Sequence, residues 1–252
     1  MDITVLRYDT VGSTNTEAAD HARRGADEGL CIIAREQTAG RGRYGRTWVS
    51  GKDAGLYMSL VLRPGIEQQR LPLITLLAGV AVHDSLTEFG ISPDIKWVND
   101  VLVNGKKICG ILADAVETSR GIAVILGIGI NLGSGNFPPE VAEIATSVEA
   151  ETQRTVSPDE MAMAVCGRLR GLYNEFVESA DTAFVIDKWR DRSSYFTGKD
   201  VRVSIDGTDV TGTTDGLEDN GALRVRTADG SIKIIHAGDV EHIRSLEQLT
   251  LN

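Results

Sequence analysis

A glycine-spaced run of three arginines at residues 37–48, QTAGRGRYGRTW, constrains this chain more than any other stretch. Gly40, Gly42 and Gly45 remove side-chain bulk and permit positive φ, so backbone N–H groups can approach a ligand that the guanidinium groups surround. The run therefore predicts an anion-binding loop. The alternative is a basic loop without a ligand, because runs of charge usually face water.

The same glycines match the GxGxxG pattern of dinucleotide-binding folds, and residues 30–34 before them are typical of the required strand. That pattern also needs a helix that begins at the last glycine and an acidic residue about twenty positions later. Residues 46–51, RTWVSG, have no helical apolar period and favour a strand or turn. We therefore expect no dinucleotide-binding fold.

Length, charge and cysteine content narrow the class of protein. The 252 residues allow one large domain, or a main domain with a smaller one. The net charge of −10 argues against a nucleic-acid or membrane partner, since both bind through clustered Lys and Arg. Three widely spaced cysteines indicate neither a disulfide framework nor a zinc site, so we expect buried thiols. With no secretory leader and no apolar run of membrane-spanning length, we expect a cytoplasmic protein.

The N-terminal region predicts a strand at residues 3–8 and then a helix. Thr14 and Glu17 have the spacing of a capping box, and Gly25 stands where a helix C-terminal glycine belongs. Residues 13–15, STN, would then lie at a helix N-terminus, where hydroxyls, an amide and free N–H groups can bind a polar or anionic ligand. Helix capping without a ligand is the alternative.

A second polar stretch lies in a predicted β-hairpin at residues 95–112, whose turn is Asn104-Gly105. Strand alternation places Lys107 on the face that carries Cys109 and Ile111. Strand lysines are usually solvated, but one that shares a face with apolar residues is a stronger functional candidate than Lys96.

Apolar patterns and turn-forming residues predict further helices and strands. Gly127 and Gly129 lie inside a predicted strand, where glycine marks close approach of another backbone or a ligand. Asn131 after them either contacts a ligand or ends the strand at a turn. Strands are also expected at 30–36 and 55–64, helices at 71–90, 158–178 and around 184–190, and a loop at 133–139. Towards the C-terminus, short strands are expected near 201–205, 210–214, 223–227 and 232–236, with turns at 206–207, 220–221 and 229–230. These short strands together suggest a small barrel.

Five short stretches resemble, in order and spacing, the motifs of the biotin protein ligases: GSTN at 12–15, EQTAGRGR at 36–43, KWVND at 96–100, KICGIL at 107–112 and GIGIN at 127–131. The resemblance implies an α+β fold, with a mixed sheet and helices like those of class II aminoacyl-tRNA synthetases at residues 1–195. A small SH3-like barrel is implied at residues 196–252. It further implies that biotin and ATP, with Mg²⁺, form biotinyl-5′-AMP, which a lysine of a biotin carboxyl carrier protein then attacks. A homodimer is also consistent with the family.

The resemblance assigns roles residue by residue. Lys107 and Arg43 are the implied catalytic residues, with Lys107 between the biotin carboxylate and the α-phosphate, and Asp100 is an open candidate for a Mg²⁺ ligand. The implied contacts of biotin are Ser13, Thr14, Asn15, Gln37, Gly40, Arg41, Lys107 and Gly110. Those of ATP and the adenylate are Arg41, Arg43, Arg46, Trp48, Lys96, Asn99 and Asn131.

The chain departs from the family pattern at two positions, with Val98 where proline is usual and Asp114 where glutamate is common. Because it starts at the catalytic motifs, we expect a short ligase without a DNA-binding domain. Two alternatives stay open. A lipoate or octanoate ligase or transferase of the same superfamily would need an apolar channel, and a non-catalytic sensor would keep the pocket without the chemistry.

Overall fold

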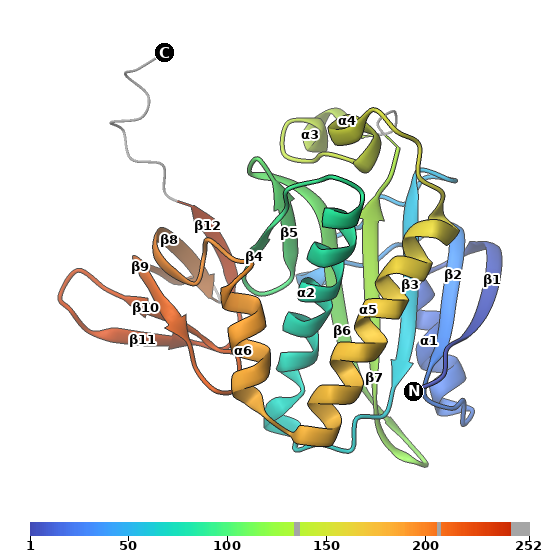
Figure 1. The fold of residues 1–252 in the computed structure, drawn as a ribbon, viewed down its shortest axis with the longest axis horizontal. Helices are drawn as coiled ribbons and strands as arrows, with labels where there is room; N and C mark the ends of the chain where they lie inside the picture. Colours follow the sequence, from blue (N-terminus) through green and yellow to red (C-terminus); the bar gives the residue numbers. More distant parts are fainter. Residues whose placement is uncertain (134–136, 206–207, 243–252) are drawn as a thin grey trace.

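The computed structural model describes residues 1–133, 137–205 and 208–242 (Figure 1). A seven-stranded sheet with the order β1-β2-β3-β7-β6-β5-β4 forms the main body. The sheet is mixed, because β1 pairs with β2 in parallel whereas the other neighbours are antiparallel. Its strands are β1 (Thr4–Val11), β2 (Leu30–Gln37), β3 (Gly55–Leu62), β4 (Asp94–Lys96), β5 (Asp100–Val103), β6 (Lys106–Thr118) and β7 (Gly121–Asn131).

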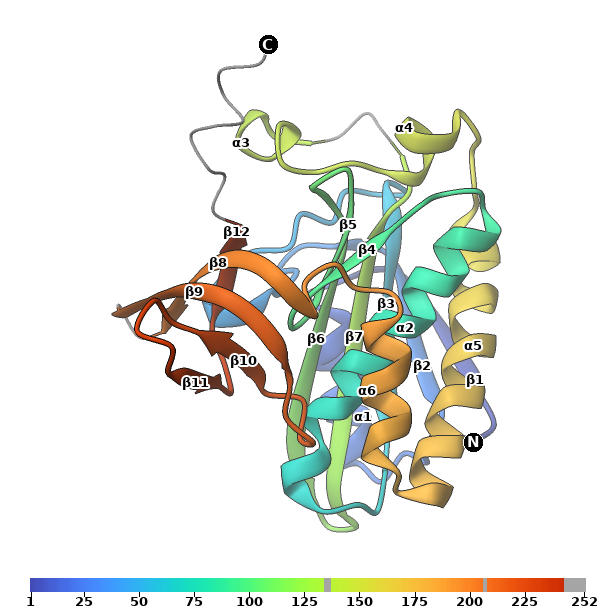
Figure 2. The ribbon, with the colours of Figure 1, turned by 60° about the vertical axis from the view of Figure 1, so that its left-hand side comes forward.

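Helices cover both faces of this sheet, as Figures 1 and 2 show. On one face α1 (Thr14–Arg23) packs its alanines against Ile32, Val61 and Ile125. The neighbouring residues along each strand point to the opposite face. There they form the larger core with α2 (Pro72–Glu88), α5 (Pro158–Ser179) and α6 (Thr182–Arg190). Burial on both faces explains why the central strands are apolar without alternation.

The observed ends of the helices can be compared with the capping residues predicted from the sequence. Ser157 caps α5 by accepting a hydrogen bond from Glu160 N at 3.2 Å, as its sequence predicts. The capping box at α1 is wrong, because Ser13 occupies the N-cap without a side-chain bond, and Thr14 is already helical. The Thr14 hydroxyl is directed elsewhere, into the polar network described below. Two short helices, α3 (Pro139–Ala142) and α4 (Val148–Thr152), were not expected; the predicted loop at 133–139 lies partly outside the described residues.

The hairpin between β5 and β6 has the predicted turn, with positive φ at Asn104 and Gly105. The predicted face of Lys107 is wrong. The register shifts so that Val101 is opposite Cys109 but Leu102 is opposite Lys107, which is one residue fewer on β5 than on β6. This bulge interrupts the alternation. Lys107 consequently lies over Gly110 on the cavity side, while Cys109 is in the core.

A five-stranded antiparallel sheet follows, with the order β11-β10-β9-β8-β12. It packs beside β4, β5 and α6 (Figure 2), where Trp97 Nε1 donates to Gly221 O at 2.9 Å. The four predicted strands are present, while β12 was missed and the turn predicted at 206–207 lies outside the described residues. The strands are β8 (Thr197–Ile205), β9 (Thr208–Leu217), β10 (Leu223–Arg226), β11 (Ile232–Ile235) and β12 (Asp239–His242).

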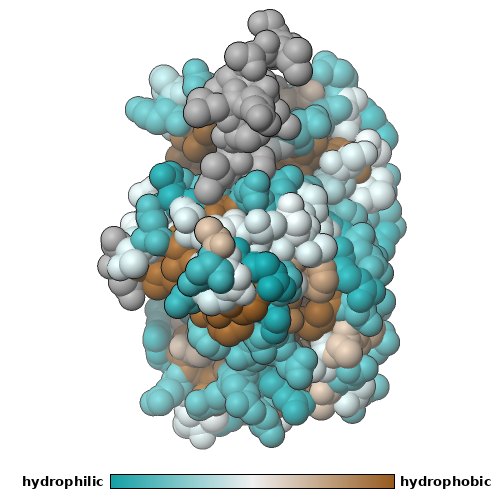
Figure 3. Space-filling view, turned by 90° about the vertical axis from the view of Figure 1, so that its left-hand side faces the viewer, coloured by the Kyte–Doolittle hydropathy of each residue, from teal (hydrophilic) through white to brown (hydrophobic). Residues whose placement is uncertain are grey.

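The expected buried thiols are confirmed, since all three cysteines are free and buried. Within the described ranges, no helix has the length and apolar character needed to cross a membrane. On the face shown in Figure 3, among the atoms that are not grey, hydrophilic residues predominate and hydrophobic residues form separate patches.

Candidate active site

A cavity of about 670 Å³ opens between the arginine loop, strands β5 to β7, residues 137–145 and β12. All the site residues predicted from the sequence line this cavity except Gly40, which lies beside it. Gly40 is nonetheless required, because a Cβ there would be 2.4 Å from Trp48 O. Segments far apart in the sequence therefore meet at one site, and the residues of the motifs surround it.

One end of the cavity is polar and buried. Ser13, Thr14 and Asn15 are each at most 5% exposed. The Thr14 N–H and hydroxyl lie 2.8 and 3.0 Å from Gln37 Oε1, and Gln37 Nε2 donates to Ser50 Oγ at 2.8 Å. This end can recognise a neutral polar group by directional hydrogen bonds.

Asn15 holds three elements together. Its Nδ2 donates to Leu112 O at 3.3 Å and to Asp114 Oδ2 at 3.2 Å, while its Oδ1 accepts from Ser59 Oγ at 2.6 Å. A Cβ at Gly127 would lie 2.0 Å from this Oδ1, so the glycine is needed for the approach. A close approach to this strand is present, but the approaching atoms are those of the Asn15 side chain and not of another backbone or a ligand.

The arginine loop is a tight reversal and not the start of an α-helix. Gly42 N donates to Arg46 O at 2.7 Å, and between them the backbone has positive φ at Tyr44 and Gly45. Residues Arg43–Gly45 form only one short 3-10 turn, η1. The dinucleotide-binding alternative is therefore excluded, since it needs a helix N-terminus at this point.

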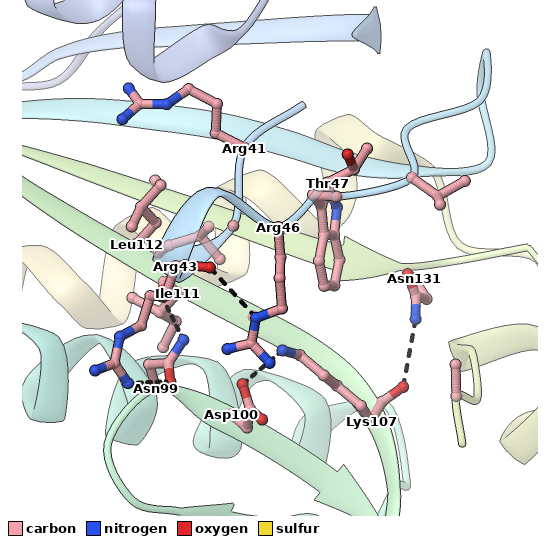
Figure 4. Close-up of a pocket in the computed structure, with 18 of the residues that line it drawn as sticks. Arg41, Arg43, Arg46, Thr47, Asn99, Asp100, Lys107, Ile111, Leu112 and Asn131 are labelled. Atoms are coloured by element: carbon pink, nitrogen blue, oxygen red, sulfur yellow. Dashed lines mark hydrogen bonds and ion pairs between the residues drawn. The ribbon is translucent and has the colours of Figure 1, made fainter. Parts of the chain in front are cut away.

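The three arginines of the loop reach in different directions. Arg41 pairs with Asp114 at 3.4 Å, and Figure 4 shows it pointing away from Lys107. Arg43 Nη1 donates to Asn99 Oδ1 at 3.1 Å and to Gly238 O at 3.4 Å. Arg46 Nη2 lies 2.9 Å from Asp239 Oδ1. The loop thus connects the main sheet to β12 across the cavity.

Beneath the loop, one carboxylate lies between two ammonium groups. Figure 4 shows this carboxylate, Asp100, beside Lys107. Asp100 Oδ1 is 2.6 Å from Lys107 Nζ, and Asp100 Oδ2 is 3.6 Å from Lys96 Nζ. The Asp100 side chain is only 16% exposed, and Lys96 and Lys107 are 23% and 33% exposed. The group carries a net positive charge in a partly desolvated place, where an anion is attracted more strongly than in water.

Trp48 lies flat on the floor of the cavity. Its indole is so close to the strands that a Cβ at Gly129 would lie 2.6 Å from its Nε1, and one at Gly110 would lie 2.9 Å from its Cζ3. Lys107 Nζ is 5.4 Å from the centroid of the Trp48 ring, a cation–π distance. The two glycines therefore make room for an aromatic wall next to the central ammonium.

Sequence reasoning missed part of the cavity wall. Val141, Ile144 and Phe137 form an apolar side of the cavity, and the exposed Val49 also lines it. Asn131 fixes this segment by donating to Thr146 O at 3.0 Å. These residues form no recognisable motif. The contribution of β12 was missed for the same reason, because Gly238 and Asp239 come more than a hundred residues after the other motifs.

The fold and the cavity define the class. Residues 8–131 match the Biotin/lipoate A/B protein ligase family, and residues 196–243 match the Biotin protein ligase C terminal domain. The solved biotin protein ligase from Aquifex aeolicus in complex with biotin and ATP is similar, with a TM-score of 0.83 at 29% identity. That similarity covers 96% of this chain and 99% of the Aquifex chain.

Curated relatives narrow the class to one family. The chain is 37% identical to the bifunctional ligase/repressor BirA of Bacillus spizizenii, over 94% of this chain and 73% of the relative. It is 35% identical to the biotin–acetyl-CoA-carboxylase ligase of Mycobacterium tuberculosis, over 92% of this chain and 86% of the relative. The chain belongs to the biotin protein ligase family, as its motifs predicted.

Proposed function

We propose that this protein attaches biotin to a lysine of a biotin carboxyl carrier protein or domain, through biotinyl-5′-AMP formed from ATP. The observation that carries the proposal is the position of Lys107, whose ammonium lines the same cavity as the buried polar residues and the arginine loop and pairs with Asp100 at 2.6 Å. A ligand with a neutral polar head and a carboxylate tail would meet hydrogen-bonding groups first and the ammonium last. Biotin has this construction.

The residue roles follow from the same arrangement. The ureido ring is bound by Ser13, Thr14 and Gln37, with Gly40, Arg41 and Gly110 beside them. Asn15 holds these residues in place through its hydrogen bonds to Ser59, Leu112 and Asp114. The nucleotide lies under the arginine loop. Its phosphates face the cationic residues, and its base lies between the indole and the apolar wall. The residues assigned to the nucleotide are Arg43, Arg46, Trp48, Lys96, Asn99 and Asn131.

In the first step a biotin carboxylate oxygen attacks the α-phosphorus, and the bond from that phosphorus to the bridging oxygen breaks to release pyrophosphate. Two anions must approach each other for this bond to form. One ammonium at 4 Å from an anion is worth about 4 kcal/mol at an effective dielectric constant near 20. Lys107 is placed to supply this attraction, and Asp100 holds its ammonium in position.

In the second step the acceptor lysine nitrogen attacks the acyl carbon, and the bond from that carbon to the phosphate oxygen breaks to release AMP. The adenylate is a mixed anhydride, so it must be kept from water until the carrier arrives. The arginine loop covers the cavity and is joined to β12 by the contacts of Arg43 and Arg46. No base for the acceptor amine is assigned.

We propose that Mg²⁺ enters with the triphosphate, since Mg²⁺ commonly binds one or two carboxylates together with substrate phosphates. Among the described residues no group of three or more His, Cys, Asp or Glu side chains could hold a metal ion. The carboxylate of Asp100 already faces two ammonium groups. These residues do not fit a protein-held metal, and no step above depends on one.

The remaining proposals concern organisation. We propose a catalytic domain at residues 1–195 and an SH3-like domain at 196–252, supported by the two separate sheets. A cytoplasmic location would give access to ATP and to carboxylases. A homodimer formed through the catalytic sheet is compatible with the long unpaired part of β6 beyond its pairing with β5.

Pyrophosphate release tests this proposal without a carrier. Purified protein with ATP and Mg²⁺ should release pyrophosphate when biotin is added and not when lipoate replaces it, because the buried end of the cavity carries polar side chains that a dithiolane cannot pair with. Release with lipoate alone would support the lipoate alternative. Biotin binding without any release would support the sensor.

A further inference from the structure

Ser59 lies beneath the polar end of the cavity and takes no part in the motifs. It belongs to β3, is fully buried, and does not line the cavity. Its hydroxyl oxygen is 2.6 Å from Asn15 Oδ1 and 2.8 Å from Thr14 Oγ1. Two residues at the N-terminus of α1 are therefore supported by one hydroxyl from the sheet.

The orientations of the flanking amides are determined by their other partners. Asn15 Nδ2 faces two acceptors, the carbonyl of Leu112 and the carboxylate of Asp114, so Asn15 Oδ1 must face Ser59. Gln37 Oε1 accepts from the backbone N–H of Thr14, a group that can only donate. Both amides consequently present oxygen, an acceptor, to the hydroxyls between them.

Four oxygens form a row: Asn15 Oδ1, Ser59 Oγ, Thr14 Oγ1 and Gln37 Oε1. This row has fewer protons than contacts. The three contacts join Asn15 to Ser59, Ser59 to Thr14, and Thr14 to Gln37. The two amide oxygens have no proton, and each hydroxyl has one. Two protons cannot serve three contacts, so in one of them lone pairs face each other. If Ser59 donates to Asn15, Thr14 can donate to Ser59 or to Gln37, but not to both.

We propose that Ser59 is a positioning residue that makes the buried end of the cavity rich in lone pairs, and so selects a ligand with N–H donors. A cyclic urea supplies such donors, and its N–H can donate to Thr14 whichever way the Thr14 proton points. The dithiolane of lipoate has no N–H and cannot supply this missing proton. This inference rests on the proposed function, because it deepens the choice of biotin as the substrate.

The test compares biotin with a lactam analogue in which CH₂ replaces one ureido N–H, using biotin-dependent pyrophosphate release by the full chain. In the parent we expect the KM of the lactam to exceed that of biotin by about a hundredfold, since a buried acceptor loses its donor. In Ser59→Ala we expect the KM of biotin to rise about tenfold and the preference for biotin over the lactam to fall at least about tenfold, with the KM of ATP unchanged.

Ser85→Ala is the matched control, because Ser85 is also fully buried but its hydroxyl donates to Ala81 O within its own helix, α2. It should leave the preference for biotin unchanged. If Ser59→Ala does not fold, Ser59→Cys keeps the size and a weak donor and should reduce the preference partly. An unchanged preference in a folded Ser59 variant would overturn the inference and leave the proposed function intact. A parent that releases no pyrophosphate with biotin would overturn both.

Discussion

The Lys107 ammonium and the Asp100 carboxylate lie 2.6 Å apart inside the cavity. The bulge that shifts the register of β5 against β6 turns Lys107 to this side, so that both residues of the pair reach the site. The partial burial of both side chains means that removing either one leaves the other charge poorly solvated. This pair is the basis of the first prediction.

Lys107→Ala should reduce the rate of adenylate formation by at least about tenfold, which corresponds to about 1.4 kcal/mol of transition-state stabilisation. Only the more distant Lys96 would then face Asp100. The rate is measured by biotin-dependent pyrophosphate release, and circular dichroism checks the fold. Lys106→Ala is the control, because Lys106 is exposed at the hairpin turn. A Lys107 variant with more than a tenth of the parental rate would show that the charge is misassigned.

Arg43→Gly should let the adenylate escape and increase the labelling of bystander lysines. The change removes the contacts of the loop with Asn99 and with Gly238 O, just before β12. Labelling is measured by mass spectrometry of an added unrelated protein. Arg120→Gly is the control, since Arg120 lies in the turn between β6 and β7 and bonds to Gly25 O and Asp27. Equal bystander labelling by parent and Arg43→Gly would contradict the role of the loop.

Gly129→Ala should raise the KM of ATP at least about tenfold, because the added Cβ would displace the Trp48 indole. The control is Gly171→Ala in α5, where a Cβ would meet nothing within 4 Å. That change should leave the KM of ATP unchanged and stabilise the helix by about 0.5–1 kcal/mol. A parental KM of ATP in Gly129→Ala would show that the indole has room to move without loss.

Asp84→Asn should destabilise the protein at neutral pH but not in strong acid. Burial acts to raise the pKa of Asp84, but hydrogen bonds from Arg192 and His83 outweigh it and lower that pKa below 3.8. A lowered carboxyl pKa stabilises the fold above the unfolded value, and this stability is lost as the pH falls through the folded value. The Tm of the variant should lie below that of the parent at pH 7, and the two should converge below pH 3.8. A constant difference would exclude ionisation as the cause. The control is Asp20→Asn, because the half-exposed Asp20 pairs with one arginine near the surface.

The sequence predicted the elements and most of the site because its signals were local. Glycine spacing predicted the arginine loop, and Gly127 and Gly129 predicted close approach, which Asn15 and Trp48 make. Each error has a specific physical cause. The capping box failed because the Thr14 hydroxyl bonds to Gln37 across the fold, and the face of Lys107 failed because a bulge is invisible to alternation.

What the sequence did not predict depends on tertiary packing. The hydroxyl of Ser59 has a role only because α1 lies over β3, and a buried serine in an apolar strand carries no motif. Asp239 reaches Arg46 only through the placement of the second sheet. Such contacts join residues 44 and 193 positions apart, beyond the range of any pattern of spacing.

The most direct test of the central claim is the mass of a carrier domain after incubation with this protein, ATP, Mg²⁺ and biotin, with lipoate in a parallel reaction. The account predicts that the carrier gains the mass of one biotinyl group, located on its acceptor lysine, with biotin and gains no mass with lipoate. A carrier that gains mass with lipoate but not with biotin would contradict the account.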